Sequence, residues 1–236
     1  MKKKNIPILF EDQAILVCEK PIGMPSQSDK SRDIDLITSL KLTMFERDQM
    51  TEEPSLFIVN RLDRPVGGVM VLAKTKEAAA ELSRQIREHT FEKNYQAVVC
   101  GYPEEEFGSM TDYLLKDGKS NTTKVVSKKT QGAKIAELDY ELIDSIETKE
   151  GVLSWLMITL HTGRHHQIRV QFASRDLGLY GDTKYNPRFQ KEKKKYRELG
   201  LYSTRIAFKH PVSKEKISFK TDPQGQAFEL MDVETY

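Results

Sequence analysis

The sequence predicts an α+β fold with a mixed, largely antiparallel β-sheet and flanking helices. Many short apolar runs separated by turn residues indicate strands, whereas few segments show a helical pattern. A doubly wound parallel sheet would need a helix between successive strands, so this class is excluded. With 236 residues, of which 38% are hydrophobic, the chain can bury one sizeable core or two subdomains.

The expected strands are short and rich in β-branched or aromatic residues. They cover residues 15–17, 69–73, 95–99, 124–126, 135–143, 153–160, 204–208 and 216–219.

Three helices are expected from apolar residues at helical spacing and from capping residues. Ser31 or Asp33 would cap a helix that ends near Arg47, and Thr75 would cap a helix over residues 76–89. A third helix would begin after the strand 153–160, with Thr162 as its N-cap.

Residues 60–68 read Asn-Arg-Leu-Asp-Arg-Pro-Val-Gly-Gly and place Asp63 between Arg61 and Arg64. Neighbouring cations favour the ionised carboxylate, which suits a nucleophile or a base. The proline restricts the backbone and the paired glycines allow tight approaches, so we expect Asp63 on a stiff loop that leads into a fully buried strand. Taken alone, the same pattern also fits an ordinary structural salt bridge.

A second polar segment, residues 160–173, contains Arg169. At helical spacing Arg169 shares a face with Phe172 and Ala173, so its guanidinium should point inward. A buried guanidinium needs an anion, and we expect Asp63 to be that partner.

A third segment, residues 91–101, reads as a strand that begins with Lys93 and Tyr95. These three segments, preceded by residues 19–24 (Glu-Lys-Pro-Ile-Gly-Met) and followed by residues 181–185 (Gly-Asp-Thr-Lys-Tyr), resemble the RluA-type pseudouridine synthase family. The resemblance runs from about residue 8 to about residue 219, and five motifs in order make it specific.

The resemblance implies roles for individual residues. Asp63 would be the catalytic aspartate, Arg61 would help to displace the target base, Tyr95 would stack on that base, and Arg169 would pair with Asp63. Further RNA contacts are expected from the basic and polar residues of the same motifs, namely Arg61, Arg64, Arg164, His165 and Lys184.

The chain departs from the family pattern at three places. Asn60 stands where histidine is usual, residues 65–67 (Pro-Val-Gly) replace the commoner Asp-Thr-Ser, and Asn186 stands where glycine is frequent. None of these changes removes a group with an assigned chemical role. Asn60 alters the hydrogen bonds that the turn can form, because a histidine could both donate and accept.

The resemblance also implies a fold and a reaction. The fold would be a single catalytic domain over residues 1–236, with a bent sheet and an active-site cleft between two subdomains. The reaction would isomerise a uridine of structured ribosomal RNA or transfer RNA without a cofactor, and the protein would act as a monomer. We expect no room for the small N-terminal RNA-binding domain that many relatives carry.

Charge is unevenly distributed although the net charge is only +2. Residues 119–134 hold five lysines and no acid, residues 184–197 hold seven basic residues and one acid, and residues 137–150 hold six acids and one lysine. This separation favours one face for an RNA backbone. For residues 191–197 two interpretations are open: a solvent-exposed loop, or a segment that contacts RNA.

Other classes of site and location have little support in the sequence. His161, His165 and His166 straddle a Thr-Gly break and lack a Cys or Glu at ligand spacing, so we expect no metal site. His165 and His166 are adjacent and should also point in different directions on a helix. Cys18 and Cys100 lie in apolar runs and are expected to be free thiols. No long apolar segment marks a membrane span or secretory signal, which predicts a cytoplasmic protein.

Two alternative functions are open. One is an RNA-binding protein that has the same fold but no catalytic activity. Its only support is Asn60, which stands where histidine is usual. The other is a glycoside or nucleoside hydrolase, which would need a second carboxylate near Asp63. Asp182 is the only candidate in a motif, and we expect it instead to close a turn after Gly181.

Overall fold

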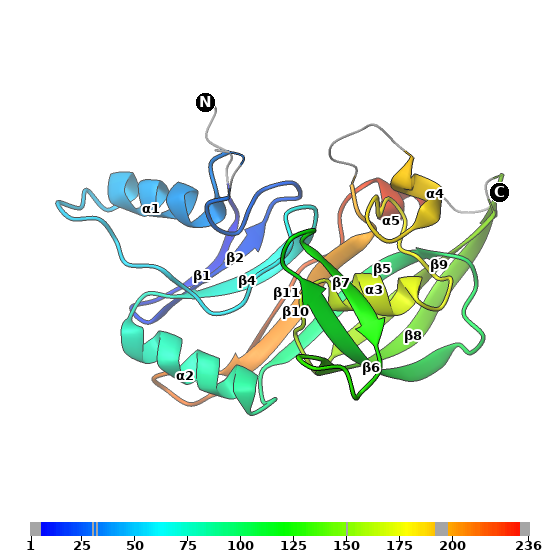
Figure 1. Cartoon of the computed structure of the whole chain (residues 1–236). Helices are drawn as coiled ribbons and strands as arrows, with labels where there is room; N and C mark the ends of the chain where they lie inside the picture. The colour runs from blue at the N-terminus through cyan, green and yellow to red at the C-terminus, as the bar shows by residue number, and fades with distance from the viewer. Residues whose placement is uncertain (1–5, 30, 32, 150, 192–197, 232–236) are drawn as a thin grey trace. The chain divides into compact units, whose positions relative to one another are not determined.

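The computed structural model describes residues 6–29, 31, 33–149, 151–191 and 198–231. The chain divides into two compact units. Unit 1 comprises Met1–Glu92 and Ser203–Asp222, and unit 2 comprises Lys93–Tyr202 and Pro223–Tyr236. Strands dominate both units and few helices flank them, which confirms the predicted α+β class (Figure 1).

Unit 1 is built on antiparallel strands with two helices. β2 pairs with β1 on one side and with β4 on the other, β3 pairs with one end of β4, and β11 pairs with β10. The elements are β1 (Ile8–Glu11), β2 (Ile15–Lys20), α1 (Leu36–Arg47), β3 (Phe57–Ile58), β4 (Gly67–Ala73), α2 (Lys76–Arg87), β10 (Leu201–Lys209, of which unit 1 holds the part from Ser203) and β11 (Lys216–Lys220).

The core of unit 1 lies between the strands and α2. All seven residues of β4 are buried, as predicted for a strand covered on both faces. Its side chains Val69 and Val71 pack in one cluster with Leu82 of α2 and Phe208 of β10. Because β4 follows directly on the Asp63 loop, the most buried strand of this unit fixes one end of that loop.

Gly68 is required by the close approach of β4 and β10. Its φ is +117°, and a Cβ added there would lie 2.1 Å from the backbone oxygen of Ser203. We expect Gly68→Ala to destabilise unit 1 by about 3 kcal/mol or more, because the strained φ and the overlap with backbone atoms add together. Chemical denaturation monitored by circular dichroism measures this change. Gly118→Ala is the control, because no atom lies within 4 Å of its added Cβ; equal losses in the two variants would contradict the explanation.

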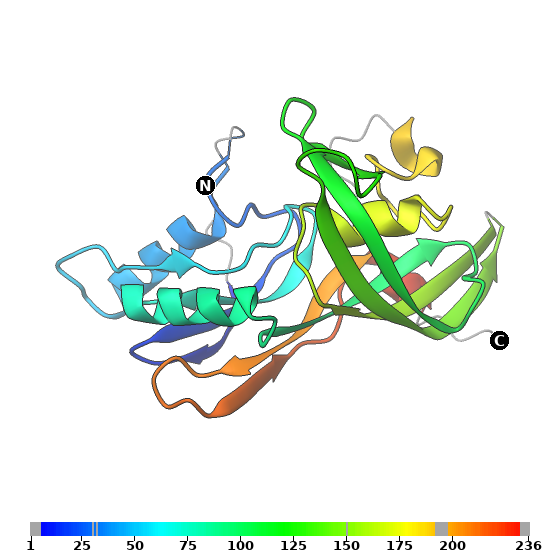
Figure 2. The same ribbon diagram turned by 60° about the horizontal axis from the view of Figure 1, so that its bottom comes forward.

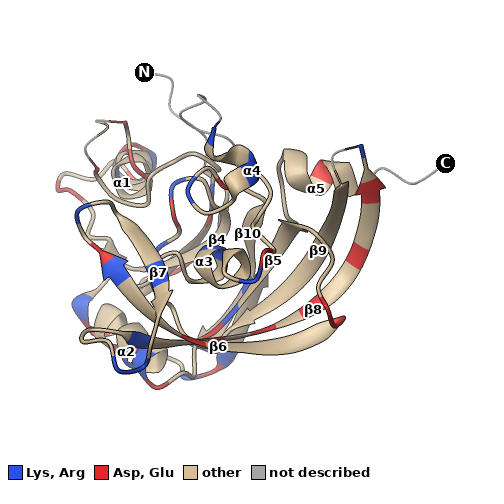
Figure 3. Cartoon of the chain, turned by 45° about the vertical axis from the view of Figure 1, so that its right-hand side comes forward, with Lys and Arg blue, Asp and Glu red and all other residues tan. Residues whose placement is uncertain are grey.

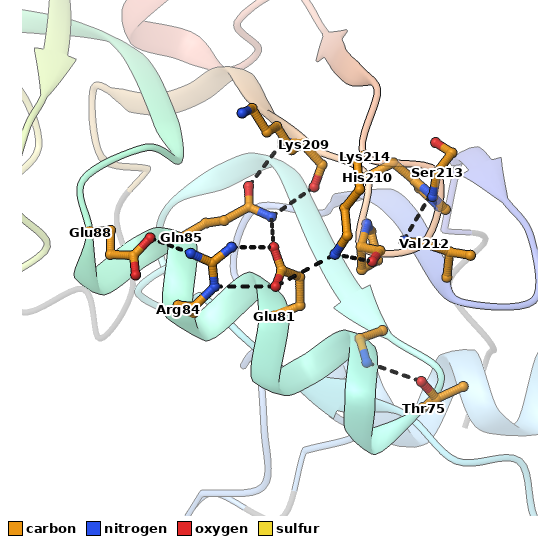
Figure 4. A network of polar contacts seen from close by, with 12 residues as sticks. Thr75, Glu81, Arg84, Gln85, Glu88, Lys209, His210, Val212, Ser213 and Lys214 are labelled. Carbon is orange, nitrogen blue, oxygen red and sulfur yellow. Dashed lines mark hydrogen bonds and ion pairs between the residues drawn. The ribbon is translucent and has the colours of Figure 1, made fainter.

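Gln85 joins α2 to the β10–β11 hairpin (Figure 4). It is 2% exposed, its side-chain amide donates to the carbonyl of Lys209 (2.8 Å), and its carbonyl accepts from the Lys209 amide (2.9 Å). The amide therefore imitates a strand partner for Lys209 while it lies on a helix. Outside this contact, Arg84 forms exposed ion pairs with Glu81 and Glu88, which contribute little to stability.

Unit 2 is an antiparallel sheet in the order β5-β9-β8-β6-β7. The helix α3 lies along β6 and β7, and α5 contacts β8 and β9 (Figure 2). The elements are β5 (Glu92–Cys100, in this unit from Lys93), β6 (Phe107–Asp117), β7 (Thr122–Val126), β8 (Lys134–Thr148), β9 (Gly151–Leu160), α3 (Gln167–Ala173), α4 (Pro187–Gln190) and α5 (Gln226–Met231).

The predicted elements are present, but the predicted cap of α1 is wrong. α1 begins at Leu36 with Asp35 as its N-cap, so neither Ser31 nor Asp33 caps it. These two residues instead bind Arg64, which the local pattern could not reveal. Thr75 is confirmed as the cap of α2. The strands β1, β3 and β6 and the short helices α4 and α5 were not predicted.

The separation of charge in unit 2 follows its strands (Figure 3). Acidic residues lie along β8, whereas the lysines lie on β7 and on the segments before and after it. Part of the second basic run, residues 192–197, lies outside the described residues. None of the helices that the structure describes is long and apolar enough to cross a membrane.

Candidate active site

In unit 1, the loop before β4 holds Asp63 by its backbone. The carbonyl of Asp63 accepts from the amide of Val66 (3.0 Å), which closes a turn over Arg64 and Pro65. On the preceding side, the carbonyl of buried Leu62 accepts from the hydroxyl of Ser26 (2.7 Å). The stiff loop predicted for Asp63 thus has a backbone contact on each side of this residue.

Lys20 anchors the same loop from the end of β2. Its side chain is completely buried, and its ammonium donates to the carbonyls of Met24 (2.7 Å), Pro21 (3.0 Å) and Arg64 (3.3 Å). Three acceptors offset much of the cost of burying the charge. The sequence motif contained Lys20, but its role as an anchor was missed; the strand alternation that aligns it with Leu16 and Cys18 was the available signal.

The two arginines that flank Asp63 differ in their surroundings. The guanidinium of Arg64 donates to the carbonyl of Gly23 (3.1 Å) and forms ion pairs with Asp33 and Asp29. Arg61 is exposed. Arg64 therefore has a structural role in the loop, and RNA contacts by either arginine stay predictions.

Asn60, the departure from the usual histidine, has an unusual environment. Its side-chain oxygen Oδ1 is buried and accepts no hydrogen bond from any residue that the structure describes. An unpaired buried acceptor costs about 1–3 kcal/mol. Asn60 thus contributes an unpaired acceptor to the motif, and the effect of the change from histidine stays a prediction.

In unit 2, β5 presents Lys93 and Tyr95 on one face. Their exposed fractions are 8% and 7%, and they alternate with the less buried Glu92, Asn94 and Gln96. An aromatic ring and a buried cation therefore lie two residues apart on the same side of the strand.

The loop between β9 and α3 is organised by Gln167. The hydroxyl of Thr162 accepts from the Glu137 amide (2.8 Å) and donates to the side-chain oxygen of Gln167 (2.8 Å), which also accepts from the Arg164 amide (3.0 Å). Thr162 is therefore not the N-cap of α3. That position belongs to His166, which has a left-handed φ of 53° and makes no side-chain cap.

Arg169 points inward from α3, as its helical spacing predicted, and is 5% exposed. Its guanidinium forms a two-point ion pair with Asp182, with Nε and one terminal nitrogen each 2.7 Å from a carboxylate oxygen. One of these oxygens also accepts from the amides of Lys184 and Tyr185, which supports the turn role expected for Asp182. Asp63 belongs to unit 1 and Arg169 to unit 2, so their pairing stays a prediction.

A series of side-chain contacts leads from Arg169 through Tyr185 to His166. The guanidinium lies 5.2 Å from the Tyr185 ring centre, and the Tyr185 hydroxyl lies 2.6 Å from Nδ1 of His166. Burial, and after it the charge of Arg169, lowers the pKa of His166 to about 2, so its ring is neutral. The Tyr185 hydroxyl accepts from the Thr123 amide (2.8 Å), and its own proton can be donated to Nδ1 of the neutral ring.

The two adjacent histidines do not point apart. Their rings stack with centres 3.7 Å apart, and His165 also contacts the hydroxyl of Thr123 (2.8 Å). The expectation that they point in different directions assumed a helix, but both precede α3. The two rings thus stack on each other and contact the hydroxyls of Thr123 and Tyr185.

The neutral state of His166 predicts a loss of stability in acid. Its pKa in the folded protein lies below the ordinary value of 6.5, so protons bind preferentially to the unfolded chain as pH falls below 6.5. We expect the free energy of unfolding to fall by up to about 1.4 kcal/mol per pH unit below that value. In His166→Asn the amide oxygen replaces Nδ1, asparagine tolerates the left-handed φ, and this acid dependence should be weaker. Urea denaturation at pH 7, 6 and 5 measures it, and equal slopes in both proteins would refute the assignment.

The remaining predicted site residues of unit 2 have hydrogen-bond partners of their own. Nε of Arg164 donates to the carbonyl of Ile135 (2.7 Å), and the ammonium of Lys184 donates to the carbonyl of Asn121 (2.9 Å). Asn186, where glycine was expected, donates to the carbonyls of Gly178 (2.9 Å) and Leu179 (3.0 Å). The structure thus gathers Arg164, His165 and Lys184 around β7, β8 and α3.

Comparison with known proteins shows which family and which relatives this chain matches. Residues 14–174 match the RNA pseudouridylate synthase family. The chain is 31% identical to a ribosomal large subunit pseudouridine synthase C of Pasteurella multocida, over 92% of this chain and 65% of that relative. It is 29% identical to a tRNA pseudouridine synthase C of Vibrio parahaemolyticus, over 93% of this chain and 91% of that relative. The chain thus spans slightly less than two thirds of the first relative.

A solved structure supports the fold. Human RNA pseudouridylate synthase domain containing 1 superposes with a TM-score of 0.75 at 18% identity, covering 94% of this chain and 85% of that one. At this identity the likeness concerns the fold alone, and it confirms the expected α+β pseudouridine synthase fold.

Proposed function

Because the chain belongs to the RNA pseudouridylate synthase family, whose members are isomerases that act on RNA, we propose that it converts specific uridines of structured ribosomal or transfer RNA into pseudouridine. The observation that carries the proposal is the backbone-anchored loop that presents Asp63 between two arginines, within the matched region. The names of these two relatives include both RNA classes, so they leave the substrate open.

The proposed reaction rearranges bonds without an added reactant. The bond from the ribose C1′ to N1 of uracil breaks, the uracil turns, and C1′ bonds to C5 of the base. The proton lost from C5 is balanced by the proton gained at N1. Ionised Asp63 would act as a nucleophile at C1′ or as a base at the neighbouring C2′.

The target base must leave its stack before it reacts, at a cost of about a few kcal/mol. Stacking on the ring of Tyr95 and phosphate contacts by basic residues would offset this cost. For these contacts we propose Arg61, Arg164, His165 and Lys184, with a smaller contribution from Arg64 because of its ion pairs. Arg169 would orient Asp63 while it keeps its pair with Asp182.

The test is to incubate total RNA from a strain that lacks this gene with purified protein and to map pseudouridine at nucleotide resolution. We expect new sites at one or a few uridines, whose positions identify the RNA. Binding of RNA without any new site would contradict catalysis and favour a binding protein on the same scaffold. Release of free uracil would instead indicate a hydrolase. The cytoplasmic location and the monomeric state stay predictions.

A further inference from the structure

Lys93 is a buried cation without a protein partner. Its side chain is 8% exposed and faces the same side of β5 as Tyr95. Among the residues that the structure describes, none forms a hydrogen bond or an ion pair with its ammonium. Lysine is rarely buried without such a partner.

Lys20 shows what a structural buried lysine looks like in this chain. Its ammonium donates to three carbonyls, which replace much of its lost hydration. Lys93 has no such set of acceptors in the described structure, so the folded protein bears the cost of its desolvation. Such a cost is often found where a group serves a ligand.

The surroundings of Lys93 point to an anion. A Cβ added at Gly163 would lie 3.4 Å from its ammonium, so the glycine leaves space beside the charge. Burial, and to a smaller extent the charge of Arg164, lowers the pKa of Lys93 to about 8. Two cations therefore act on the same region, and no carboxylate contributes to the shift.

We propose that Lys93 and Arg164 bind a phosphate group of the RNA substrate, beside the base that stacks on Tyr95. This inference rests on the proposed function and names a contact that holds the target nucleotide. A phosphate carries the full negative charge that two adjacent cations require, whereas a neutral carbonyl of uracil would not offset both. The space left by Gly163 lets a phosphate oxygen approach the ammonium.

The test compares the intact protein with Lys93→Met, first without RNA. Because the variant removes an uncompensated buried charge, its Tm in chloride should be equal to or higher than that of the intact protein. Exchange of chloride for inorganic phosphate at constant ionic strength should raise the Tm of the intact protein more than that of the variant, because the general stabilising effect of phosphate is common to both. Lys93→Gln, which is also neutral and of similar length, should behave in the same way.

The second arm uses the RNA segment identified by the mapping experiment. We expect Lys93→Met to raise KM by about tenfold, the effect of one lost charge-assisted hydrogen bond, and to change kcat much less. Lys220→Met, which removes one exposed charge from β11, is the matched control and should leave KM, kcat and the phosphate response unchanged.

Several results would overturn the inference. A lower Tm for both neutral variants in chloride, without a change in the phosphate response, would make Lys93 a structural residue. Loss of the phosphate response with an unchanged KM would show binding of free phosphate only. If the intact protein forms no pseudouridine, the proposed function fails, but the phosphate arm still reports on the anion site. If Asp63 proves essential and Lys93→Met behaves as the intact protein, the function stands and the inference falls.

Discussion

Replacement of Asp63 by asparagine should reduce the rate of pseudouridine formation by at least about a thousandfold. The amide has nearly the same shape as the carboxylate, but it is neutral and can neither attack C1′ nor take a proton from C2′. The backbone of the loop should be unaffected, because its contacts use the carbonyls of Leu62, Asp63 and Arg64. Single-turnover assays on the mapped RNA segment measure the loss.

Two controls separate chemistry from folding and binding. Asp63→Asn should keep the Tm of the intact protein within a few degrees and should still bind RNA. Asp176→Asn changes an exposed aspartate to the same amide and should retain full activity. Substantial turnover by Asp63→Asn would show that another group carries the reaction.

Replacement of Asp182 by asparagine should destabilise unit 2 by about 3–5 kcal/mol, which corresponds to a fall in Tm of roughly 10 °C. The side chains of Arg169 and Asp182 are 5% and 0% exposed, so water cannot replace the lost ion pair. In addition, if the remaining oxygen keeps the two backbone amides of the turn, the new amide nitrogen would face the Nε–H donor of Arg169 and leave it unpaired.

Thermal unfolding followed by circular dichroism measures this loss. Asp176→Asn again provides the matched control, because its carboxylate is exposed and the substitution is identical. A fall in Tm no larger than that of the control would show that the buried pair contributes little to stability. The role of Arg169 would then have to be sought in RNA binding or in its predicted pairing with Asp63.

Most strands were predictable because their signals are local. β4 follows from one unbroken apolar run, and α2 follows from Thr75 and from apolar residues at helical spacing. β6 was missed because its eleven residues alternate weakly and carry several polar groups. α1 was given the wrong cap because Ser31, Asp33 and Asp35 are all good capping residues, and only the tertiary contacts of Arg64 distinguish them.

The candidate site shows the same limit. The inward direction of Arg169 followed from helical spacing, but its partner Asp182 is 13 residues away and lies in a separate turn. The stacked histidines were misjudged because α3 begins after them, at Gln167. Lys20 and Lys93 both lie near the ends of strands. No local sequence pattern shows that the ammonium of Lys20 donates to three carbonyls.

The sequence alone therefore determined the α+β class, the buried strand after the Asp63 loop and the motifs that identify the family, because these depend on residues close in the chain. Only the tertiary structure decided which buried charges have partners. Arg169 meets Asp182 and Lys20 meets three carbonyls, whereas Lys93 meets no partner in the described part of the chain. Such pairing depends on how distant segments approach and on how much water they exclude, and neither quantity is written in a local pattern.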